Sequence, residues 1–258
     1  MEPFQAYLAA TNEKQLVGKV LAEEVANYSI SKAGVVKNIL DLGCGSGEVS
    51  LQIIQALDKT KQPYEYDALD ISKESLNKFK AKTPTADLTR IKFWEQKFDE
   101  NYKPIRRYNI LIACQFLYYF QNAQEIIEKL LSMSDETIIV HHGFTGLEEF
   151  ENEYADYVSK SVYGNTTYAD IQSWLNKANE QNNFEIKFKQ LACDVNIQKC
   201  KDFKSEEGRA LLSFFVGSDV ATLPLAIQKE MPLFLERSYP DIIQRQQGIF
   251  FIRRKIKV

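Results

Sequence analysis

A glycine-rich segment constrains the fold of this 258-residue chain more than any other feature. It reads Asp41-Leu-Gly-Cys-Gly-Ser-Gly-Glu48. The apolar run 37–42 leads into it like a buried strand, and residues 48–57 leave it with helical spacing of apolar positions. Glycine has no Cβ, so the backbone can turn tightly there and lie close to a ligand. A strand that enters a helix through such a turn predicts a sheet covered by helices.

Strand-like and helix-like segments alternate along the rest of the chain. Strands are expected at 37–42, 64–70, 91–94, 108–114, 137–141, 184–190 and 248–255. Helices are expected at 4–28 with a break near Thr11 and Asn12, and at 48–57, 72–80, 123–131, 147–158, 167–179 and 211–239, the last interrupted by Pro224 and Pro232. This alternation predicts an α/β fold with a Rossmann-like, doubly wound, mostly parallel sheet, to which N-terminal helices and C-terminal elements are added.

No stretch has the composition of a linker, so a single domain over 1–258 is expected. Within it, 1–30 is predicted to form a helical lid or substrate segment. Residues 31–142 are predicted to form the cofactor-binding core. The remainder, 143–258, is predicted to add elements on the substrate side and the last strands of the sheet.

The composition is that of an ordinary soluble globular protein, with 45% hydrophobic and 26% charged residues. No apolar run approaches the roughly 18–20 residues of a membrane span, so no membrane partner is expected. Residues 1–15 lack a basic stretch followed by an apolar one, so we expect a cytoplasmic protein. The net charge of −3 argues against nucleic acid as the main partner. We further expect a monomer.

A metal site is not expected. The cysteines form no C-x-x-C pair and are interpreted as reduced thiols; they are Cys44, Cys114, Cys193 and Cys200. The adjacent His141 and His142 would point to opposite faces of a strand, so they cannot readily share one metal.

The glycine spacing selects among nucleotide ligands. The segment has glycine at 43, 45 and 47, but Glu48 stands where a dinucleotide fingerprint would have another glycine. Asp41 and Glu48 would repel a pyrophosphate and would suit a cationic ligand without phosphate. S-adenosylmethionine, with its sulfonium and ammonium groups, fits that description. Asp70, at the end of the next strand, can accept hydrogen bonds from ribose hydroxyls. A purely structural turn and an NAD site are the alternatives.

The strand 108–114 delivers a polar and aromatic stretch to the edge of the sheet where ligands bind. Gln115 can donate and accept hydrogen bonds there. Tyr118 and Tyr119 could offer ring faces to a cation, although packing at the start of a helix is an equal alternative. No (N/D)-P-P-(Y/F) motif follows this strand, which argues against methylation of adenine or of glutamine amides.

These residues resemble class I S-adenosylmethionine-dependent methyltransferases, and the wider pattern is similar to the histamine N-methyltransferases. The similar blocks are 4–15, 39–54, 70–75, 110–120, 138–146, 168–175 and 248–252. The Gln-x-Leu-Tyr-Tyr stretch from Gln115 and the matched ends of the chain are the most specific of them.

The resemblance implies a set of site residues. For the acceptor it implies a carboxylate at Glu13 and amides at Gln115 and Gln247, the last in place of the family's Asn; Tyr118 and Tyr119 complete the predicted acceptor residues. The predicted cofactor residues are Asp41, Gly43, Gly45, Gly47, Asp70, Ser75, Asp99 and Cys114. Two tryptophans of the family's lid fall on Leu147 and Glu151, so a less aromatic acceptor site is expected.

The resemblance also implies a reaction. We expect N-methylation of a small, histamine-like amine or imidazole, with S-adenosyl-L-homocysteine as the second product. The protein would act by alignment, without a catalytic acid, base or metal. Two alternatives stay open: another acceptor, such as a histidine-containing peptide, another metabolite or a protein side chain, and a binding module that keeps the cofactor without turnover.

Overall fold

The structure is a computed structural model, and it describes residues 1–31, 34–143, 145–158, 166–182 and 184–255. The chain forms two compact units. Unit 1 contains Met1–Lys14, His142–Asn165 and Ala192–Gln247. Unit 2 contains Gln15–His141, Thr166–Leu191 and Gly248–Val258.

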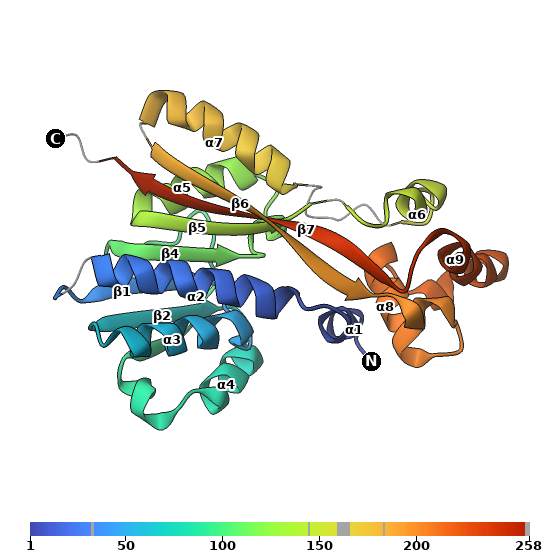
Figure 1. The fold of residues 1–258 in the computed structure, drawn as a ribbon, viewed down its shortest axis with the longest axis horizontal. Coiled ribbons are helices and arrows are strands. Elements are labelled where there is room, and N and C mark those ends of the chain that lie inside the picture. The colour runs from blue at the N-terminus through green and yellow to red at the C-terminus, as the bar shows by residue number, and fades with distance from the viewer. Residues whose placement is uncertain (32–33, 144, 159–165, 183, 256–258) are drawn as a thin grey trace. The chain divides into compact units, whose positions relative to one another are not determined.

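The described residues form a seven-stranded sheet with the strand order β3-β2-β1-β4-β5-β7-β6 (Figure 1). The strands are β1 (Lys37–Leu42), β2 (Tyr64–Asp70), β3 (Ile91–Glu95), β4 (Tyr108–Cys114), β5 (Ser134–His142), β6 (Phe184–Asn196) and β7 (Ile242–Arg254). From β3 to β5 all neighbours are parallel. The arrow of β7 points opposite to that of β4 in Figure 1. The prediction of a Rossmann-like, mostly parallel sheet is therefore confirmed.

Helices cover both faces of the sheet in unit 2. The α-helices of the described residues are α1 (Pro3–Ala10), α2 (Glu13–Ser31), α3 (Glu48–Thr60), α4 (Lys73–Lys82), α5 (Ala123–Met133), α6 (Glu148–Glu153), α7 (Tyr168–Asn182), α8 (Glu206–Val216) and α9 (Leu225–Ser238). Short 3-10 helices are η1 (Thr85–Thr89), η2 (Leu117–Tyr119), η3 (Gln198–Lys201) and η4 (Val220–Thr222).

Alternate residues of each strand build two separate hydrophobic layers. In β1, Ile39 packs with α2 and α3, whereas Leu40 packs with α5 and α7 on the other face. In β7, Phe251 and Phe250 divide in the same way. Successive side chains of a strand point to opposite faces, so a sheet buried on both faces needs continuous apolar strands. The run Tyr108–Cys114 meets that need.

Unit 1 has a hydrophobic core of its own. Phe150 of α6, Leu212 and Val216 of α8 and Met231 of α9 are buried in it. The break between α1 and α2 is tied to β6 in this unit, because Thr11 forms a bridge with Val195. The break expected near Thr11 and Asn12 is thus confirmed.

Of the two interruptions expected in the helical stretch 211–239, the one at Pro224 is confirmed and the one at Pro232 is wrong. The stretch forms two helices, α8 and α9, because Gly217 ends α8 in the left-handed region and Pro224 stands directly before α9. Pro232 does not interrupt α9. The last two strands are longer than expected, since β6 continues to Asn196 and β7 begins at Ile242. Among the described helices, none combines the length and apolar character needed to cross a membrane.

Candidate cofactor and acceptor sites

The carboxyl ends of β1, β2 and β4 meet at one edge of the sheet in unit 2. Leu42 at the end of β1 is in register with Leu69 of β2 on one side and with Ala113 of β4 on the other. Ligands of open parallel sheets bind where the strand order reverses, as it does here. The residues that come next along the three strands are predicted cofactor residues: Gly43, Asp70 and Cys114.

The three glycines of the loop share a positive φ but differ in what a Cβ at each position would meet. All have positive φ, at 66° for Gly43, 56° for Gly45 and 81° for Gly47, where residues with a Cβ are strained. A Cβ at Gly43 would lie 2.8 Å from the ring of Phe116, and one at Gly47 would clash with the ring of Phe79. A Cβ at Gly45 would have no described atom within 4 Å. Gly45 thus borders open space, which is where a ligand could lie against the loop.

Asp70 ties the glycine loop to the start of α4. Its Oδ2 accepts the N–H of Gly45 and its Oδ1 accepts the N–H of Ser72, both at 2.8 Å. Ser72 caps α4 by accepting the N–H of Ser75 at 3.2 Å. A carboxylate oxygen offers two lone-pair sites, so each oxygen of Asp70 retains capacity for a hydroxyl donor.

Asp41 is buried beneath the loop. Its Oδ2 accepts the hydroxyls of Ser50 at 2.6 Å and Tyr66 at 2.7 Å. Burial, and then the charge of Asp41, raise the pKa of Tyr66 well above its ordinary value, so that hydroxyl remains a donor. Asp41 supports the strand end from within the protein, and its direct contact with a cofactor stays a prediction.

The loop is less negative than its sequence indicates, because Glu48 has partners. Its Oε1 accepts the ammonium of Lys82 at 2.9 Å and the hydroxyl of Ser46 at 2.7 Å. Burial raises the pKa of Glu48, but these two partners hold it below its ordinary value. Lys82 therefore offsets part of the repulsion of a pyrophosphate that the sequence attributes to Glu48.

The remaining negative charge still acts on the loop. Burial, followed by the charges of Asp41 and Asp70, raises the pKa of the Cys44 thiol. Burial is the larger cause and disfavours any charge, whereas the two carboxylates disfavour an anion and favour a cation. The site retains the sign of charge that a sulfonium or an ammonium requires.

Phe98, in the loop after β3, belongs to the same hydrophobic layer as Leu42 at the end of β1. Phe98 packs edge-on against Phe116, with ring centroids 5.5 Å apart, and Phe116 is the side chain closest to Gly43. Asp99 follows directly, and its Oδ1 accepts the N–H of Asn101 at 2.9 Å. The structure thus places Asp99 beside a residue of this layer, and its role toward a cofactor stays a prediction.

Gln115 has an unusual backbone. Its φ is 52°, and its N–H donates to the carbonyl of Val140 at 2.9 Å. The left-handed region costs a residue with a Cβ about 1–2 kcal/mol, and such strain is concentrated at functional sites. The structure therefore holds Gln115, directly after β4, in a strained backbone conformation of the kind found at functional sites.

An aromatic group follows Gln115 in unit 2. The hydroxyl of Tyr118 donates to that of Tyr119 at 3.3 Å, and their ring centroids are 4.4 Å apart. Tyr119 is 55% exposed. The ring of Tyr118 also lies 6.0 Å from that of the buried His141.

The sequence did not predict that His141 would lie beside the predicted acceptor residue Tyr118. Its Nε2–H donates to the carbonyl of Thr166 at 2.9 Å. Burial lowers the pKa of His141 to about 4, although the Thr166 carbonyl acts in the opposite direction, so the imidazole is neutral at pH 7. Its fully buried position at the end of β5 follows from tertiary packing rather than from any sequence pattern.

Unit 1 brings together two of the predicted acceptor residues. Glu13, in the first turn of α2, and Gln247, near the middle of β7, are 4% and 1% exposed. The amide of Gln247 donates to Glu13 Oε2 at 3.0 Å. The hydroxyl of Tyr7 donates to the same oxygen at 2.7 Å. Tyr7 is a residue that sequence reasoning missed, because its helical position indicated only an apolar contact.

Glu13 is held in place by the start of α2. Its backbone N–H donates to the hydroxyl of Thr11 at 3.1 Å, and that hydroxyl donates to the carbonyl of Asp194 at 3.0 Å. Asn12 exchanges further hydrogen bonds with Asp194. The carboxylate therefore starts from a backbone that β6 fixes within unit 1.

The two positions expected to replace lid tryptophans have different environments in unit 1. Leu147 is 1% exposed and packs in the core of this unit. Glu151 is half-buried; burial raises its pKa, and the charge of Arg245 acts against that. Neither side chain supplies an aromatic surface.

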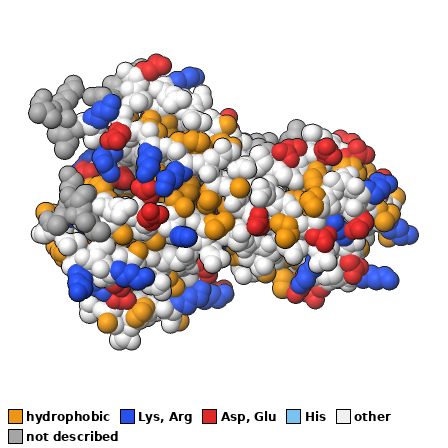
Figure 2. Space-filling view, in the orientation of Figure 1, with side chains coloured by type: hydrophobic (Ala, Val, Ile, Leu, Met, Phe, Trp, Pro, Cys, Tyr) orange, Lys and Arg blue, Asp and Glu red, His pale blue; other side chains and the backbone are white. Residues whose placement is uncertain are grey.

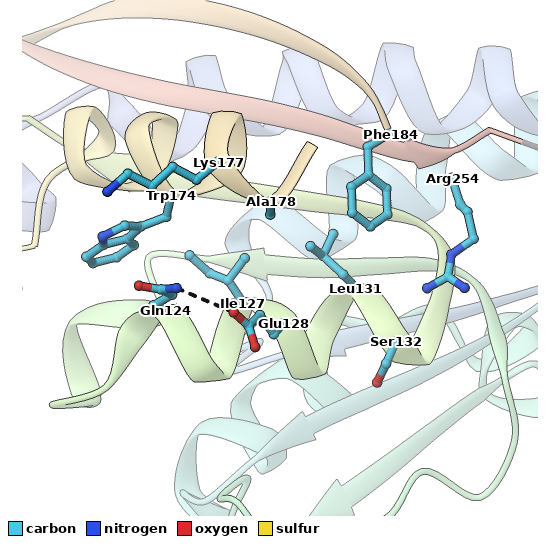
Figure 3. A pocket seen from close by; sticks show the side chains of 10 residues that line it. All are labelled: Gln124, Ile127, Glu128, Leu131, Ser132, Trp174, Lys177, Ala178, Phe184 and Arg254. Carbon is cyan, nitrogen blue, oxygen red and sulfur yellow. Dashed lines mark hydrogen bonds between the residues drawn. The ribbon is translucent and has the colours of Figure 1, made fainter. Parts of the chain in front are cut away.

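Separate cavities lie elsewhere in each unit. One of about 390 Å³ in unit 2 lies between α5 and α7 and is lined by side chains such as Glu128, Trp174 and Arg254 (Figure 3). Another, of about 720 Å³ in unit 1, is lined by residues of α1 and α8, including Phe4 and Arg209. None of the predicted site residues lines either cavity.

On the face drawn in Figure 2, acidic and basic side chains are interspersed over most of the surface, and acidic side chains gather at the upper right, where Figure 1 draws α6. Within the described residues, no three His, Cys, Asp or Glu side chains come together as a set that could hold a metal ion.

Comparison with known proteins agrees with this arrangement. A model of the methyltransferase domain family matches residues 35–187. The chain is 24% identical over 154 residues to malonyl-(acyl-carrier protein) O-methyltransferase 1 of Ilyobacter polytropus; the match covers 60% of this chain and 48% of that protein. The chain thus spans about half the length of the curated relative it matches.

Solved structures share the fold. The structure of magnesium protoporphyrin IX methyltransferase from Synechocystis PCC 6803, with bound S-adenosylhomocysteine, is 18% identical, with a TM-score of 0.55 over 94% of this chain and 84% of that chain. A cyclopropane-fatty-acyl-phospholipid synthase-like protein from Lactobacillus casei ATCC 334 is 13% identical, with a TM-score of 0.53 over 92% of each chain.

Proposed function

The chain belongs to the methyltransferase domain family of class I, S-adenosylmethionine-dependent enzymes, and on that basis we propose that its methyl acceptor is a small amine or imidazole of the histamine type. The observation that carries this proposal is the buried carboxylate of Glu13, which accepts one hydrogen bond from Gln247 and another from Tyr7. The resemblance assigns this carboxylate to the cationic group of the acceptor, and a carboxylate forms charge-assisted hydrogen bonds with an ammonium.

The residues of unit 2 fit the cofactor. Gly45 borders open space, so the adenosine and methionine parts can lie against the loop without meeting a Cβ. Asp70 retains lone pairs for the ribose hydroxyls. Asp41 and Asp70 supply the potential that a sulfonium requires. Ser75, Asp99 and the other predicted cofactor residues complete this proposed set.

The proposed reaction is direct transfer to nitrogen. When bound, S-adenosylmethionine would supply an electrophilic methyl group on its sulfonium. The acceptor's nitrogen lone pair would form the new N–C bond as the S–C bond breaks, with S-adenosylhomocysteine as the second product and the proton of the methylated acceptor released to water. An imidazole with a pKa of about 6.5 is mostly neutral at pH 7 and has that lone pair available. The protein contributes alignment and exclusion of water. In unit 1, Glu13 would hold the acceptor's ammonium and Gln247 would orient its ring. Gln115, Tyr118 and Tyr119 of unit 2 keep the acceptor roles that the resemblance implies.

A larger acceptor is the second candidate. Leu147 and Glu151 supply no aromatic surface where the resembling family has tryptophans, which favours a wider acceptor such as a histidine-containing peptide or a protein side chain. The relatives also differ in their acceptors, as their names show: one acts on malonyl-(acyl-carrier protein) and another on magnesium protoporphyrin IX.

The test is transfer of a labelled methyl group from S-adenosylmethionine to histamine, to a panel of small amines and imidazoles, and to histidine-containing peptides. Glu13→Gln keeps the shape of the side chain but removes its charge. We expect the KM for the amine acceptor to rise at least about tenfold, while the Kd of S-adenosylhomocysteine by calorimetry changes less than about twofold.

Glu23→Gln is the matched control, because Glu23 is exposed on the same helix, α2. It should leave both constants unchanged. Methylation of peptides but of no small amine would select the larger acceptor. Cofactor binding with no methylated product from any acceptor would instead identify a binding module.

A further inference from the structure

The cavity between α5 and α7 lies in unit 2, and none of the predicted cofactor or acceptor residues lines it. Its volume, about 390 Å³, is in the range of small-molecule sites. We propose that it is a second ligand site, which binds a small monocarboxylate with an aromatic body through Arg254 at one end and Trp174 at the other. This proposal does not depend on the identity of the methyl acceptor.

The walls of the cavity are largely apolar and belong to the core of unit 2. Ile127 and Leu131 point from α5 toward α7, and Phe184 at the start of β6 points into the same space (Figure 3). These three side chains are 2%, 6% and 5% exposed, so the core holds them in place. Trp174 of α7 packs against the same layer but is only half-buried, so part of its indole is accessible to a ligand.

The described side chains that line the cavity include two cations and one acid. Lys177 comes from α7 and Arg254 from the end of β7, whereas Glu128 of α5 is the acid. Within the ranges that the structure describes, neither cation forms an ion pair. The lining therefore favours an anion, although the chain as a whole has a net charge of −3.

Arg254 is the group that would bind the carboxylate. Figure 3 draws it with Phe184 at one end of the cavity, while Trp174 and Gln124 lie at the other end. The guanidinium carbon of Arg254 lies 5.9 Å from the centroid of the Phe184 ring, a cation–π contact that orients it. A guanidinium binds a carboxylate through two parallel, charge-assisted hydrogen bonds, which fixes the direction in which the ligand enters the cavity.

The rest of the cavity selects an aromatic body with a single charge. Trp174 and Phe184 present rings to the space, and aromatic pairs attract one another beyond the burial of apolar area. Lys177 and Glu128 stand on facing helices, α7 and α5, so their charges offset each other in part. A second anionic group on the ligand would therefore gain little, and one carboxylate at Arg254 suffices.

The experiment compares two probes that share a ring and differ in charge, 3-phenylpropionate and its neutral amide, 3-phenylpropanamide. Binding to the protein saturated with S-adenosylhomocysteine is measured by calorimetry, so that the cofactor site is already occupied. The chain has two tryptophans, Trp94 and Trp174. In a Trp94→Phe background the fluorescence therefore reports on Trp174 alone, and it shows whether the probe lies in this cavity.

We expect the carboxylate to bind at least about tenfold more tightly than the amide and to change the fluorescence of Trp174 saturably. Arg254→Gln should reduce that preference to about twofold or less. Its unfolding in urea should match that of the unmodified protein, because the side chain is exposed. Arg237→Gln is the matched control, since Arg237 is an exposed arginine of α9 in unit 1 and the net charge changes equally. It should leave the preference unchanged.

Three results would overturn the proposal. Equal affinity for the two probes, or no saturable binding of either up to about 10 mM, would show that the cavity does not select an anion. A preference that survives Arg254→Gln would place the carboxylate elsewhere. Binding of the carboxylate without a change in Trp174 fluorescence would place the probe outside the cavity. None of these results bears on the amine acceptor, which Glu13→Gln tests separately.

Discussion

The carboxylate of Asp70 accepts the backbone N–H of Gly45 at 2.8 Å, across 25 residues of sequence. This bond connects the end of β2 with the loop that follows β1. The donor of this bond is Gly45, the glycine of the loop that borders open space. The residue proposed to hold the ribose therefore also holds the loop on which the cofactor would lie.

Asp70→Asn should weaken the cofactor more than it weakens the fold. The amide keeps one acceptor oxygen but loses the charge and the second acceptor, so hydrogen bonds to ribose hydroxyls become weaker. We expect the Kd of S-adenosylmethionine to rise about tenfold or more by calorimetry. Asp135→Asn is the control, since Asp135 pairs with Arg107 on the surface. Equal effects of the two variants would contradict the assignment of Asp70.

Gly45→Ala should remove cofactor binding without a steric clash inside the protein. Its φ of 56° makes the substitution strained, by about 1 kcal/mol, and its Cβ would project into the open space beside the loop. Gly34→Ala is the matched control, because Gly34 has a φ of 80° and also no described atom within 4 Å of a built Cβ. The two variants should lose similar stability in urea unfolding. Only Gly45→Ala should lose S-adenosylhomocysteine binding, and retained binding would refute the ligand position.

Gln115→Gly should separate stability from activity. Glycine relieves the positive φ, so we expect the free energy of unfolding to stay level or to rise by up to about 1 kcal/mol, while kcat/KM for the acceptor falls. Lys61 is the other residue with a Cβ and a positive φ in the described ranges, and it ends α3. Lys61→Gly should raise stability by a similar amount with unchanged activity. An unchanged kcat/KM in Gln115→Gly would show that the strained amide serves only the backbone.

His141 should make the stability of the protein depend on pH between about 4 and 6.5. Its folded pKa, about 4, lies below the ordinary 6.5, so protons bind the unfolded chain more readily in that interval. Stability contributed by the neutral imidazole is fully present above pH 6.5 and decreases as the pH falls toward 4, by roughly 3 kcal/mol at most. Urea unfolding of the protein and of His141→Leu at several pH values measures this difference. Parallel curves for the two would show that the imidazole is not buried in its neutral form.

The core of the fold follows from local sequence patterns. The first strands are continuous apolar runs, and each ends at a turn or cap that its residues specify, such as the glycines 43–47 or the Ser72 cap of α4. Parallel strands joined by helices leave few arrangements, so the order of β1 to β5 was predictable. The residues at the carboxyl ends of these strands were predictable for the same reason.

The later strands were not predictable in full, because hydrogen bonds of a sheet do not depend on apolar side chains. The first residues of β7, Ile242–Gln247, include four polar side chains in succession from Gln244. They show no apolar alternation, yet they pair in the sheet. Gln247 was identified only through the resemblance to a family, and its hydrogen bond to Glu13 joins residues 234 positions apart.

The partners of charged groups were also beyond local reasoning. Glu48 looked like an unpaired acid of the loop, but Lys82 at the end of α4 binds it. Tyr7 looked like an apolar residue of α1, but its hydroxyl meets Glu13 across the break between two helices. Each pairing depends on where a neighbouring helix ends in space. The spacing of apolar residues along the sequence does not predict this position.

Unit 1 is assembled from three separate stretches of the chain, with parts of unit 2 between them. The unit that contains Glu13 and Gln247 is therefore not encoded by one continuous segment of the gene, and one continuous segment could not transfer it to another protein. Exchange of one continuous gene segment therefore cannot replace unit 1 as a whole and give the protein a new acceptor. Changes in substrate preference would have to accumulate through individual codons and short insertions.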